Sequence, residues 1–361
     1  MDYIYWESKY TNIRMIMIIK GISASLPSRI VTNDDMVEMI KDQSTEFEGD
    51  LDKTLETIKK LLDNSGLKQR HWCDRHELPI DHVAKACKQA LADSYLQKNH
   101  IELLIYVGIG RGFLEPGNSH MIANALGFDK AQCFDIVDAC MSWVRAIQLV
   151  DNLFKSGGYR NALIINAEFN THPGGPLYPH NLNLRQRSQV EHTFPSFTIG
   201  EAATATLLIP NEPENFEFYF STRPDLSDLC TIPLQNYEGF CHPTEKIGKN
   251  GIMQFTSYGL DLHNHAHKEA VGVFKKMSKR SPIHKVFVHA SSKKEWDKFG
   301  THVGLNEKIH HIYPNTGNVV SASLPVAMSD AIETGKLKRD ENVVFWVGSA
   351  GMSFSTTRFR Y

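Results

Sequence analysis

The chain has 361 residues, of which 42 % are hydrophobic and 22 % charged, and its formal net charge is −2. This composition is ordinary for a globular protein, and the length allows two domains or one large two-lobed core. The charge gives no electrostatic reason to expect a nucleic-acid partner. The apolar runs are too short to span a bilayer, and the first residues lack the basic start of a signal peptide, so no membrane partner is expected either.

The cysteines indicate a reducing compartment. There are six of them, and no two form a CxxC pair. In a chain of this size, scattered cysteines argue against a disulfide framework. We therefore expect a cytoplasmic protein, in which the cysteines other than Cys140 are packing residues.

The first half of the chain alternates apolar strand patterns with helical ones. Strands are predicted at 15–21, 101–107, 133–136 and 162–167, and helices at 33–40, 55–62, 83–95, 119–126 and 144–157. Short apolar runs between helices are typical of parallel strands in an α/β fold. Residues 169–196 show no regular period, and a segment of this kind often borders a site.

Cys140 lies where a short strand turns into a buried helix. Unpaired backbone N–H groups and the positive end of the helix dipole at such a place favour a thiolate and a neighbouring oxyanion. This is a suitable position for a nucleophile. The alternative is that Cys140, with Ala139 and Ser142, is only a small residue that lets the helix start close to the sheet.

The second half repeats the pattern of the first. Apolar strands are predicted at 285–289, 309–313 and 343–347, with helices between them. A common offset relates Gly127 to Gly304, Cys140 to Gly317, and Gly158 to Gly335. We interpret this as an internal duplication with halves at 15–210 and 211–361. Packing of two βαβαβ halves about a pseudo-two-fold axis would bring the loops at Cys140 and at Gly317-Asn318 together, at the end of the strand that stops at His289.

Three stretches together resemble the thiolase superfamily, and most closely its beta-ketoacyl-acyl-carrier-protein synthase III group. They are Asp138-Ala139-Cys140, His289-Ala290-Ser291-Ser292, and Gly317-Asn318 with the residues up to Pro325. The glycine-containing stretch from Gly348 to Phe354 resembles the closing loop of that group. The resemblance implies a thiolase-like α/β fold of two duplicated halves in five layers, α-β-α-β-α, and usually a homodimer.

The same resemblance implies a Cys-His-Asn site at Cys140, His289 and Asn318. Cys140 would take an acyl group from a coenzyme A or carrier-protein thioester, with no permanently bound cofactor. The backbone N–H groups of Cys140 and Gly351 would form the oxyanion hole. His289 and Asn318 would donate hydrogen bonds to a malonyl-type extender. Taken singly, His289 is also explained as a satisfied histidine at a strand end, and Asn318 as a helix cap.

Some positions depart from the group's pattern. Lys60 and Asn64 replace the Trp and Arg that hold coenzyme A, and Glu115 replaces an apolar residue of the acyl pocket. The Gly-Asp-Gly turn reads Ile199-Gly200-Glu201. These changes predict a specialised relative, in secondary-metabolite biosynthesis, that acts as a homodimer or as a hetero-oligomer with related subunits, with an acyl carrier protein as a possible partner.

Two alternatives remain open at this point. One is a non-catalytic subunit of a multi-component acyltransferase, as in phloroglucinol biosynthesis. The other is an acyltransferase that does not decarboxylate. A metal is not expected, because His263 and His267 share a helix face without a carboxylate or cysteine at ligand spacing.

Overall fold

The computed structural model describes residues 16–361 except 93, 174, 212–215 and 278–280. Residue 15, the predicted start of the first half, lies outside the described residues. Two five-stranded sheets dominate the fold. Within the described ranges, no helix is long and apolar enough to cross a bilayer.

The two sheets have the same topology. The first has the order β5-β4-β6-β7-β1 and the second the order β12-β11-β13-β14-β8. In each, three parallel strands are followed by two that pair antiparallel. The strands of the first sheet are β1 (Ile16–Ser25), β4 (Leu103–Val107), β5 (Gln132–Ile136), β6 (Ala162–Glu168) and β7 (Ala202–Asn211). Those of the second are β8 (Glu217–Thr222), β11 (Lys285–Val288), β12 (Ile309–His310), β13 (Asn342–Ser349) and β14 (Ser353–Arg360).

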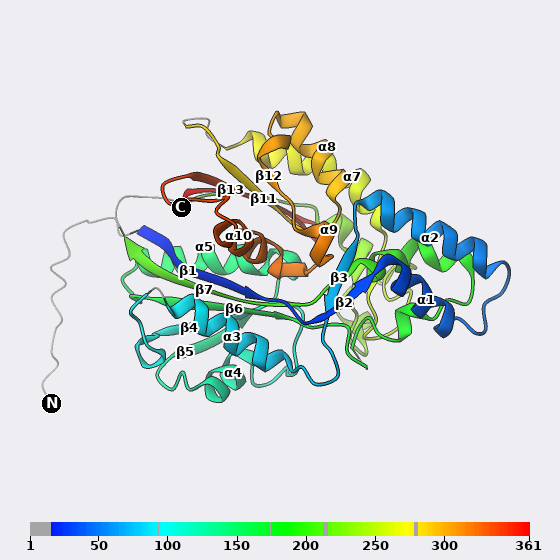
Figure 1. The fold of residues 1–361 in the computed structure, drawn as a ribbon, viewed down its shortest axis with the longest axis horizontal. Helices are drawn as coiled ribbons and strands as arrows, with labels where there is room; N and C mark the ends of the chain where they lie inside the picture. Colours follow the sequence, from blue (N-terminus) through cyan, green and yellow to red (C-terminus); the bar gives the residue numbers. More distant parts are fainter. Residues whose placement is uncertain (1–15, 93, 174, 212–215, 278–280) are drawn as a thin grey trace, which may run out of the picture.

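Helices separate and cover the sheets, as Figure 1 shows. The central pair is α5 (Ser142–Lys155) and α10 (Ser323–Glu333), and its side chains share one core with the inner faces of both sheets. On the outer faces lie α3 (Pro79–Ala92), α4 (Asn118–Leu126), α7 (Gly259–Lys275) and α8 (Lys293–Val303). The predicted five-layered fold is confirmed. The boundary at 210/211 stays a prediction, because residues 212–215 are not described.

The predicted register between the halves is only partly right. Gly127 and Gly304 do correspond, since both end a helix in the left-handed conformation, with φ of 74° and 72°. Cys140, however, corresponds to Ser321 and not to Gly317. Each lies second in a single 3-10 turn before a central helix, η2 (Ala139–Met141) and η9 (Val320–Ala322). The predicted offset fails there because the second half inserts a short helix, α9 (Tyr313–Thr316), before its turn.

The same comparison corrects the third glycine pair. The residue with positive φ after α5 is Gly157, at 74°, and its counterpart after α10 is Gly335, at 68°. Gly158, which the sequence paired with Gly335, does not have a positive φ. The duplication is therefore real in topology, but insertions and helix lengths shift its register from one loop to the next.

A smaller region extends beyond one end of the sheets (Figure 1). It contains β2 (Arg29–Thr32), α1 (Asn33–Gln43), α2 (Leu51–Ser65) and β3 (Gln69–Trp72). Much of the predicted irregular segment 169–196 packs here as short turns: η3 (His180–Leu182), η4 (Arg187–Gln189) and α6 (Val190–Thr193), followed by η5 (Phe194–Thr198). The hydroxyl of Ser44 at the end of α1 binds the backbone of Leu182 and Leu184, at 3.2 and 2.9 Å, and so anchors the segment.

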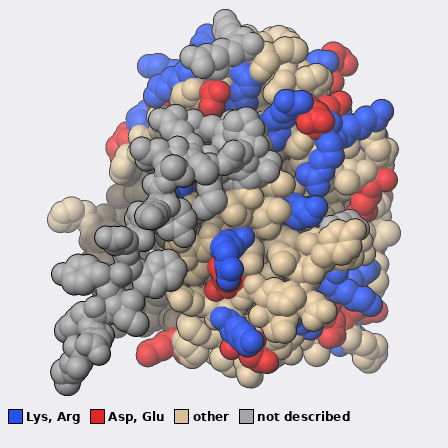
Figure 2. All heavy atoms as spheres, turned by 90° about the vertical axis from the view of Figure 1, so that its left-hand side faces the viewer, with Lys and Arg blue, Asp and Glu red and all other residues tan. Residues whose placement is uncertain are grey.

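On the face at the left of Figure 1, basic and acidic side chains lie next to one another, as Figure 2 shows.

Two short strands, β9 (Cys230–Thr231) and β10 (Thr256–Ser257), pair beside the irregular segment, and η6 (Pro224–Leu229) and η7 (Tyr237–Gly239) flank β9. The remaining turns are η1 (Lys98–His100) and η8 (Asn306–Lys308).

Candidate active site

The turn that carries Cys140 is held from both halves of the fold. Ala139 has a φ of 45°, which is uncommon and strained for a residue with a Cβ. The backbone N–H of Met141 donates to the carbonyl of Asp138 at 2.9 Å and lies 3.2 Å from the hydroxyl of Ser349, at the end of β13. The second half of the chain thus fixes the conformation of the Cys140 turn.

The Cys140 side chain is half-buried in a small apolar cluster. Its neighbours are Ile109, Leu177, Ile199, Phe255 and Val320. Burial raises the pKa of the thiol well above its ordinary value, and the Cys230 thiol and the Glu168 carboxylate raise it further. The backbone N–H of Cys140 itself acts in the opposite direction, with a smaller effect.

These surroundings act against the thiolate that a helix N-terminus would favour. The helix α5 begins only at Ser142, and the pKa of the thiol is raised by desolvation first and then by Cys230, Glu168 and Asp138. Cys140 therefore rests as a thiol.

His289 and Asn318 lie side by side, as the resemblance implies. His289 follows β11 and is 7 % exposed, and its Nε2 is 3.2 Å from Oδ1 of Asn318. The same oxygen accepts the backbone N–H of Val320 at 2.9 Å. Because this oxygen faces donors, we assign the imidazole proton to Nε2. That assignment leaves the amide N–H groups of Asn318 available for a ligand.

The backbone of Asn318 is clamped by the segment before β7. Its N–H donates to the carbonyl of Thr198 at 2.8 Å, and its carbonyl accepts the N–H of Gly200 at 3.0 Å. A Cβ on Gly200 would lie 2.0 Å from the carbonyl oxygen of Thr316, so only glycine fits. Ile199, between these contacts, belongs to the apolar cluster of Cys140. Ile199 and Val320 thus connect the cluster of Cys140 to Asn318, and Asn318 is hydrogen-bonded to His289.

His289 is neutral at physiological pH. Burial lowers its pKa from 6.5 to about 4, against the smaller effect of the hydrogen bond with Asn318. A neutral ring can donate from Nε2 but carries no charge. This suits hydrogen bonding to a carbonyl oxygen better than formation of a stable ion pair with Cys140.

The depressed pKa of His289 predicts acid sensitivity. The unfolded chain binds a proton at this histidine near pH 6.5 and the folded chain only near pH 4, so stability falls as the pH falls through that window. Between about pH 7 and pH 5, the wild type should lose about 2 kcal/mol more of its free energy of unfolding than a His289→Asn variant. Urea unfolding of both proteins at the two pH values measures this difference. Equal losses would contradict a buried, neutral His289.

Gly351, the second predicted oxyanion donor, lies in the tight turn between β13 and β14 with a φ of 108°. Ser349, two residues earlier, contacts the Cys140 turn through the carbonyl of Asp138 at 3.3 Å as well as through Met141. The closing loop therefore lies against the Cys140 turn. The role of the Gly351 N–H stays a prediction.

Glu168 is a residue of the site that the sequence analysis missed. It is fully buried at the end of β6, and burial raises its pKa. Its carboxylate accepts the hydroxyl of Ser321, which is the counterpart of Cys140, and the N–H of Gly110 at 3.0 Å. Asn166 donates to the same hydroxyl at 2.8 Å. Glu168 thereby ties the η9 turn to the loop after β4. The signal in the sequence was the presence of Asn166 and Glu168 at the end of an apolar strand.

The positions that depart from the family pattern are placed as follows. Lys60 and Asn64 are exposed on α2, and Glu115 is exposed in the loop between β4 and α4. Glu201 is buried, and its carboxylate accepts the N–H and the hydroxyl of Thr171 at 2.9 and 2.7 Å. His267, from the pair considered for a metal, packs edge-on against the rings of Phe299 and His302.

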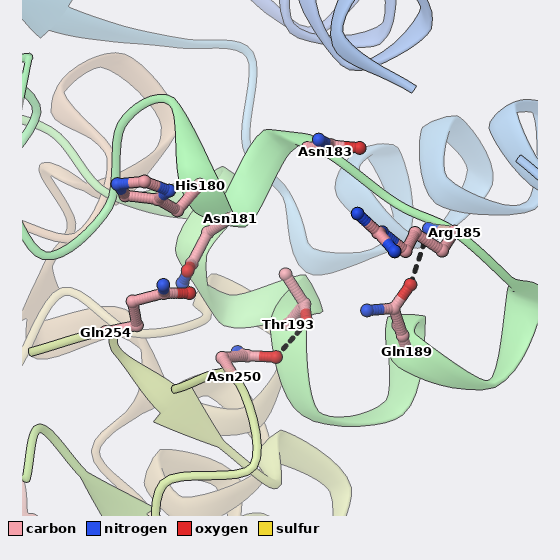
Figure 3. A pocket seen from close by; sticks show the side chains of 8 residues that line it. All are labelled: His180, Asn181, Asn183, Arg185, Gln189, Thr193, Asn250 and Gln254. Atoms are coloured by element: carbon pink, nitrogen blue, oxygen red, sulfur yellow. Dashed lines mark hydrogen bonds between the residues drawn. The ribbon is translucent and has the colours of Figure 1, made fainter. Parts of the chain in front are cut away.

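A polar pocket of about 310 Å³ lies next to the apolar cluster. Figure 3 shows the polar side chains that line it: His180, Asn181, Asn183, Arg185, Gln189, Thr193, Asn250 and Gln254. Asn181 is 2 % exposed and donates to the carbonyl of Phe255 at 2.7 Å, while its own Oδ1 has no partner among the described residues. Since Phe255 contacts the cluster around Cys140, the pocket adjoins the site.

Comparisons with protein families match two parts of the chain. Residues 275–361 match the family model described as 3-oxoacyl-[acyl-carrier-protein (ACP)] synthase III C terminal, and residues 134–173 match 3-oxoacyl-[acyl-carrier-protein (ACP)] synthase III. The two matches contain Cys140, His289, Asn318 and Gly351.

Curated relatives match the chain over most of its length or over part of it. The beta-ketoacyl-[acyl-carrier-protein] synthase III of Sulfurimonas denitrificans is 25 % identical over 348 residues, which are 93 % of this chain and 96 % of the relative. That of Ehrlichia canis is 32 % identical over 152 residues, 42 % of this chain and 43 % of the relative.

Solved structures have the same fold. OleA of Xanthomonas campestris with bound lauric acid and lauroyl-CoA superimposes with a TM-score of 0.79 at 18 % identity, over 97 % of this chain and all of that one. A cerulenin-bound OleA superimposes with a TM-score of 0.78 at 18 % identity, over 96 % and 98 % of the two chains.

Proposed function

We propose that the chain is a beta-ketoacyl synthase III-like condensing acyltransferase of the thiolase superfamily, and that it joins two acyl units through an acyl-enzyme on Cys140. The observation that carries the proposal is the arrangement of Cys140, His289 and Asn318. The thiol lies in an apolar cluster with Ile199 and Val320, which adjoin Asn318, and the amide of Asn318 is hydrogen-bonded to the neutral imidazole of His289.

In the first half-reaction, the sulfur of Cys140 attacks the carbonyl carbon of a thioester. The thiol proton leaves with the departing thiol, so the exchange needs no permanent base. The backbone N–H groups of Cys140 and Gly351 stabilise the oxyanion, each donor contributing roughly 3 kcal/mol in comparable sites. The strained turn at Ala139 fixes the backbone conformation before Cys140, and so the direction of the Cys140 N–H relative to its sulfur.

In the second half-reaction, a malonyl-type extender places its thioester carbonyl between His289 and Asn318. The Nε2–H of the neutral imidazole exchanges Oδ1 of Asn318 for the extender carbonyl, and together with the Nδ2–H of the amide it stabilises the enolate that forms as carbon dioxide leaves. The enolate carbon then attacks the acyl group on Cys140, the carbon–sulfur bond breaks, and the thiolate released takes up a proton from solvent to restore the thiol. A cationic histidine is not needed, which agrees with its lowered pKa.

The polar pocket supports a thioester donor with a long polar arm, such as coenzyme A or the phosphopantetheine of a carrier protein. Asn181 offers an unpartnered acceptor and Arg185 a cation next to the cluster of Cys140. The similar OleA of known structure contains lauroyl-CoA, which is a donor of this class. Such a donor is a substrate, and no permanently bound cofactor is proposed.

Product analysis tests this function. The purified protein is incubated with a donor acyl thioester and a carbon-13-labelled malonyl thioester, and products are identified by mass spectrometry. We expect a beta-keto product that has lost labelled carbon dioxide. Transfer of the acyl group to oxygen or nitrogen acceptors without a new carbon–carbon bond would instead favour the non-decarboxylating acyltransferase.

We also propose self-association through the edge of the first sheet. β5 is an edge strand, and exposed apolar side chains lie near it, Val137 at 59 % and Leu114 at 74 % exposed. Edges of this kind are usually paired or covered.

The departures at Lys60, Asn64 and Glu115 favour a specialised role in secondary metabolism, in the cytoplasm. Purification with a stoichiometric foreign subunit, and no activity alone, would favour the non-catalytic subunit.

A further inference from the structure

A second group of reactive side chains lies away from Cys140, at the connection between β3 and α3. Cys73 follows β3 directly, Glu77 lies in the next loop, and His82 is in the first turns of α3. The sulfur, a carboxylate oxygen and a ring nitrogen of these residues lie within 4.8 Å of one another. Nothing in the reaction proposed above uses them.

His82 is held as metal-binding histidines usually are. Its Nδ1 is 2.9 Å from the hydroxyl of Ser25, and its ring packs against Phe169 with centroids 5.7 Å apart. The hydrogen bond at Nδ1 leaves Nε2 facing Glu77, whose Oε1 is 3.5 Å away. A second partner on the far nitrogen fixes the orientation of the ring, which is the common arrangement around zinc.

The other two side chains are fixed by backbone groups. Glu77 accepts the N–H of Ser28 at 3.0 and 3.1 Å and that of Asp74 at 2.9 Å. The N–H of Cys73 donates to the buried Glu201 at 2.7 Å, and Glu201 is in turn held by Thr171. The cluster is therefore preorganised before any ion binds.

The charges around the cluster also favour a cation. Glu77 and Glu201 are both acidic, and in the part of the chain that the structure describes neither forms an ion pair with Lys or Arg. Cys73 and Glu77 are half-buried, so one side of the cluster faces solvent and leaves room for a water ligand.

We propose that Cys73, Glu77 and His82 bind one Zn²⁺, with water as the fourth ligand. One sulfur, one imidazole nitrogen and one carboxylate oxygen form a donor set typical of zinc, and three protein ligands leave an open tetrahedral position. On binding, the thiol of Cys73 loses its proton to solvent, and the deprotonated sulfur and the carboxylate balance the charge of the ion.

Such an ion would stabilise the segment 198–201, which holds the backbone of Asn318 by hydrogen bonds. The ring N–H of Trp72, next to Cys73, donates to the carbonyl of Ile199 at 2.9 Å, and the N–H of Glu201 donates to His71 at 2.8 Å. The zinc site thus adjoins the segment that clamps the backbone of Asn318.

Metal binding to the full chain tests the proposal. The protein is stripped with a chelator, and Zn²⁺ is titrated against a chromophoric competitor while native mass spectrometry gives the stoichiometry. We expect one Zn²⁺ per chain in the wild type and in Cys241→Ser, where the exposed thiol serves as the control. Cys73→Ser and His82→Gln should bind at least about tenfold more weakly.

Cobalt provides a readout specific to the sulfur. Co²⁺ alone should give a thiolate charge-transfer absorption with the wild type and Cys241→Ser, and none with Cys73→Ser. Thermal unfolding of each variant in chelator verifies that it folds without the ion. The proposal is overturned if the wild type binds no Zn²⁺, or if folded Cys73→Ser and His82→Gln bind it as tightly as the wild type does.

Discussion

Proteins with His289→Ala or Asn318→Ala should still become acylated on Cys140 but should condense about 10²-fold or more slowly than the wild type. Acylation uses the Cys140 turn and the backbone N–H groups, and both substitutions leave the Ser349 contacts of that turn in place. Condensation needs the two side-chain donors at the extender carbonyl, and loss of one donor in comparable sites lowers the rate by about 10²- to 10³-fold.

Rapid-mixing kinetics followed by intact mass separate the two steps for each variant. His263→Gln is a matched control, because His263 is also a histidine with a burial-lowered pKa and lies near His289. The control should retain both steps. If His289→Ala abolished acylation itself, the imidazole would be acting as a base on the thiol, and the reaction would be closer to that of a plain acyltransferase.

Cys140→Ala should lower condensation by at least about 10³-fold, because the proposed reaction carries the acyl group on Cys140. Folding should be preserved, because Ala is smaller than Cys and the substitution leaves the strained residue of the turn, Ala139, unchanged. Turnover with saturating donor and extender measures the loss.

Cys230→Ala is the control for Cys140→Ala, since Cys230 is a second half-buried thiol near Cys140. It should remain active, because Cys230 does not carry the acyl group in the proposed reaction. Loss of activity in Cys230→Ala together with full activity in Cys140→Ala would contradict this assignment and identify Cys230 as the nucleophile.

The layers of the fold could be predicted because their signals are local. Apolar runs such as those that became β4 and β6 alternate with helical patterns, and glycines mark the helix ends. His289 lies directly after β11 and Cys140 a few residues after β5, so their places could be predicted from strand ends, whereas Asn318 follows the inserted α9 and was singled out by the resemblance of its stretch to the family. The register could not be predicted in full, since the insertion of α9 shifts Cys140 onto Ser321 without changing the order of elements.

What escaped prediction depends on contacts between distant parts of the chain. Glu168 is recognisable as part of the site only once Ser321 is seen to donate to it. The protonation of Cys140 follows from its apolar surroundings, which are supplied by five separate segments. The cluster of Cys73, Glu77 and His82 has no spacing that marks a metal site, and Glu201 and Ser25, which orient it, lie far from it in sequence.

Intact-mass analysis with peptide mapping, after incubation with an acyl thioester and no extender, tests the central claim most directly. We predict that the wild type gains the mass of one acyl group on the peptide that contains Cys140, and that addition of extender discharges it. An acyl group on a different residue, or turnover without any covalent adduct, would contradict the assignment of Cys140 as the nucleophile.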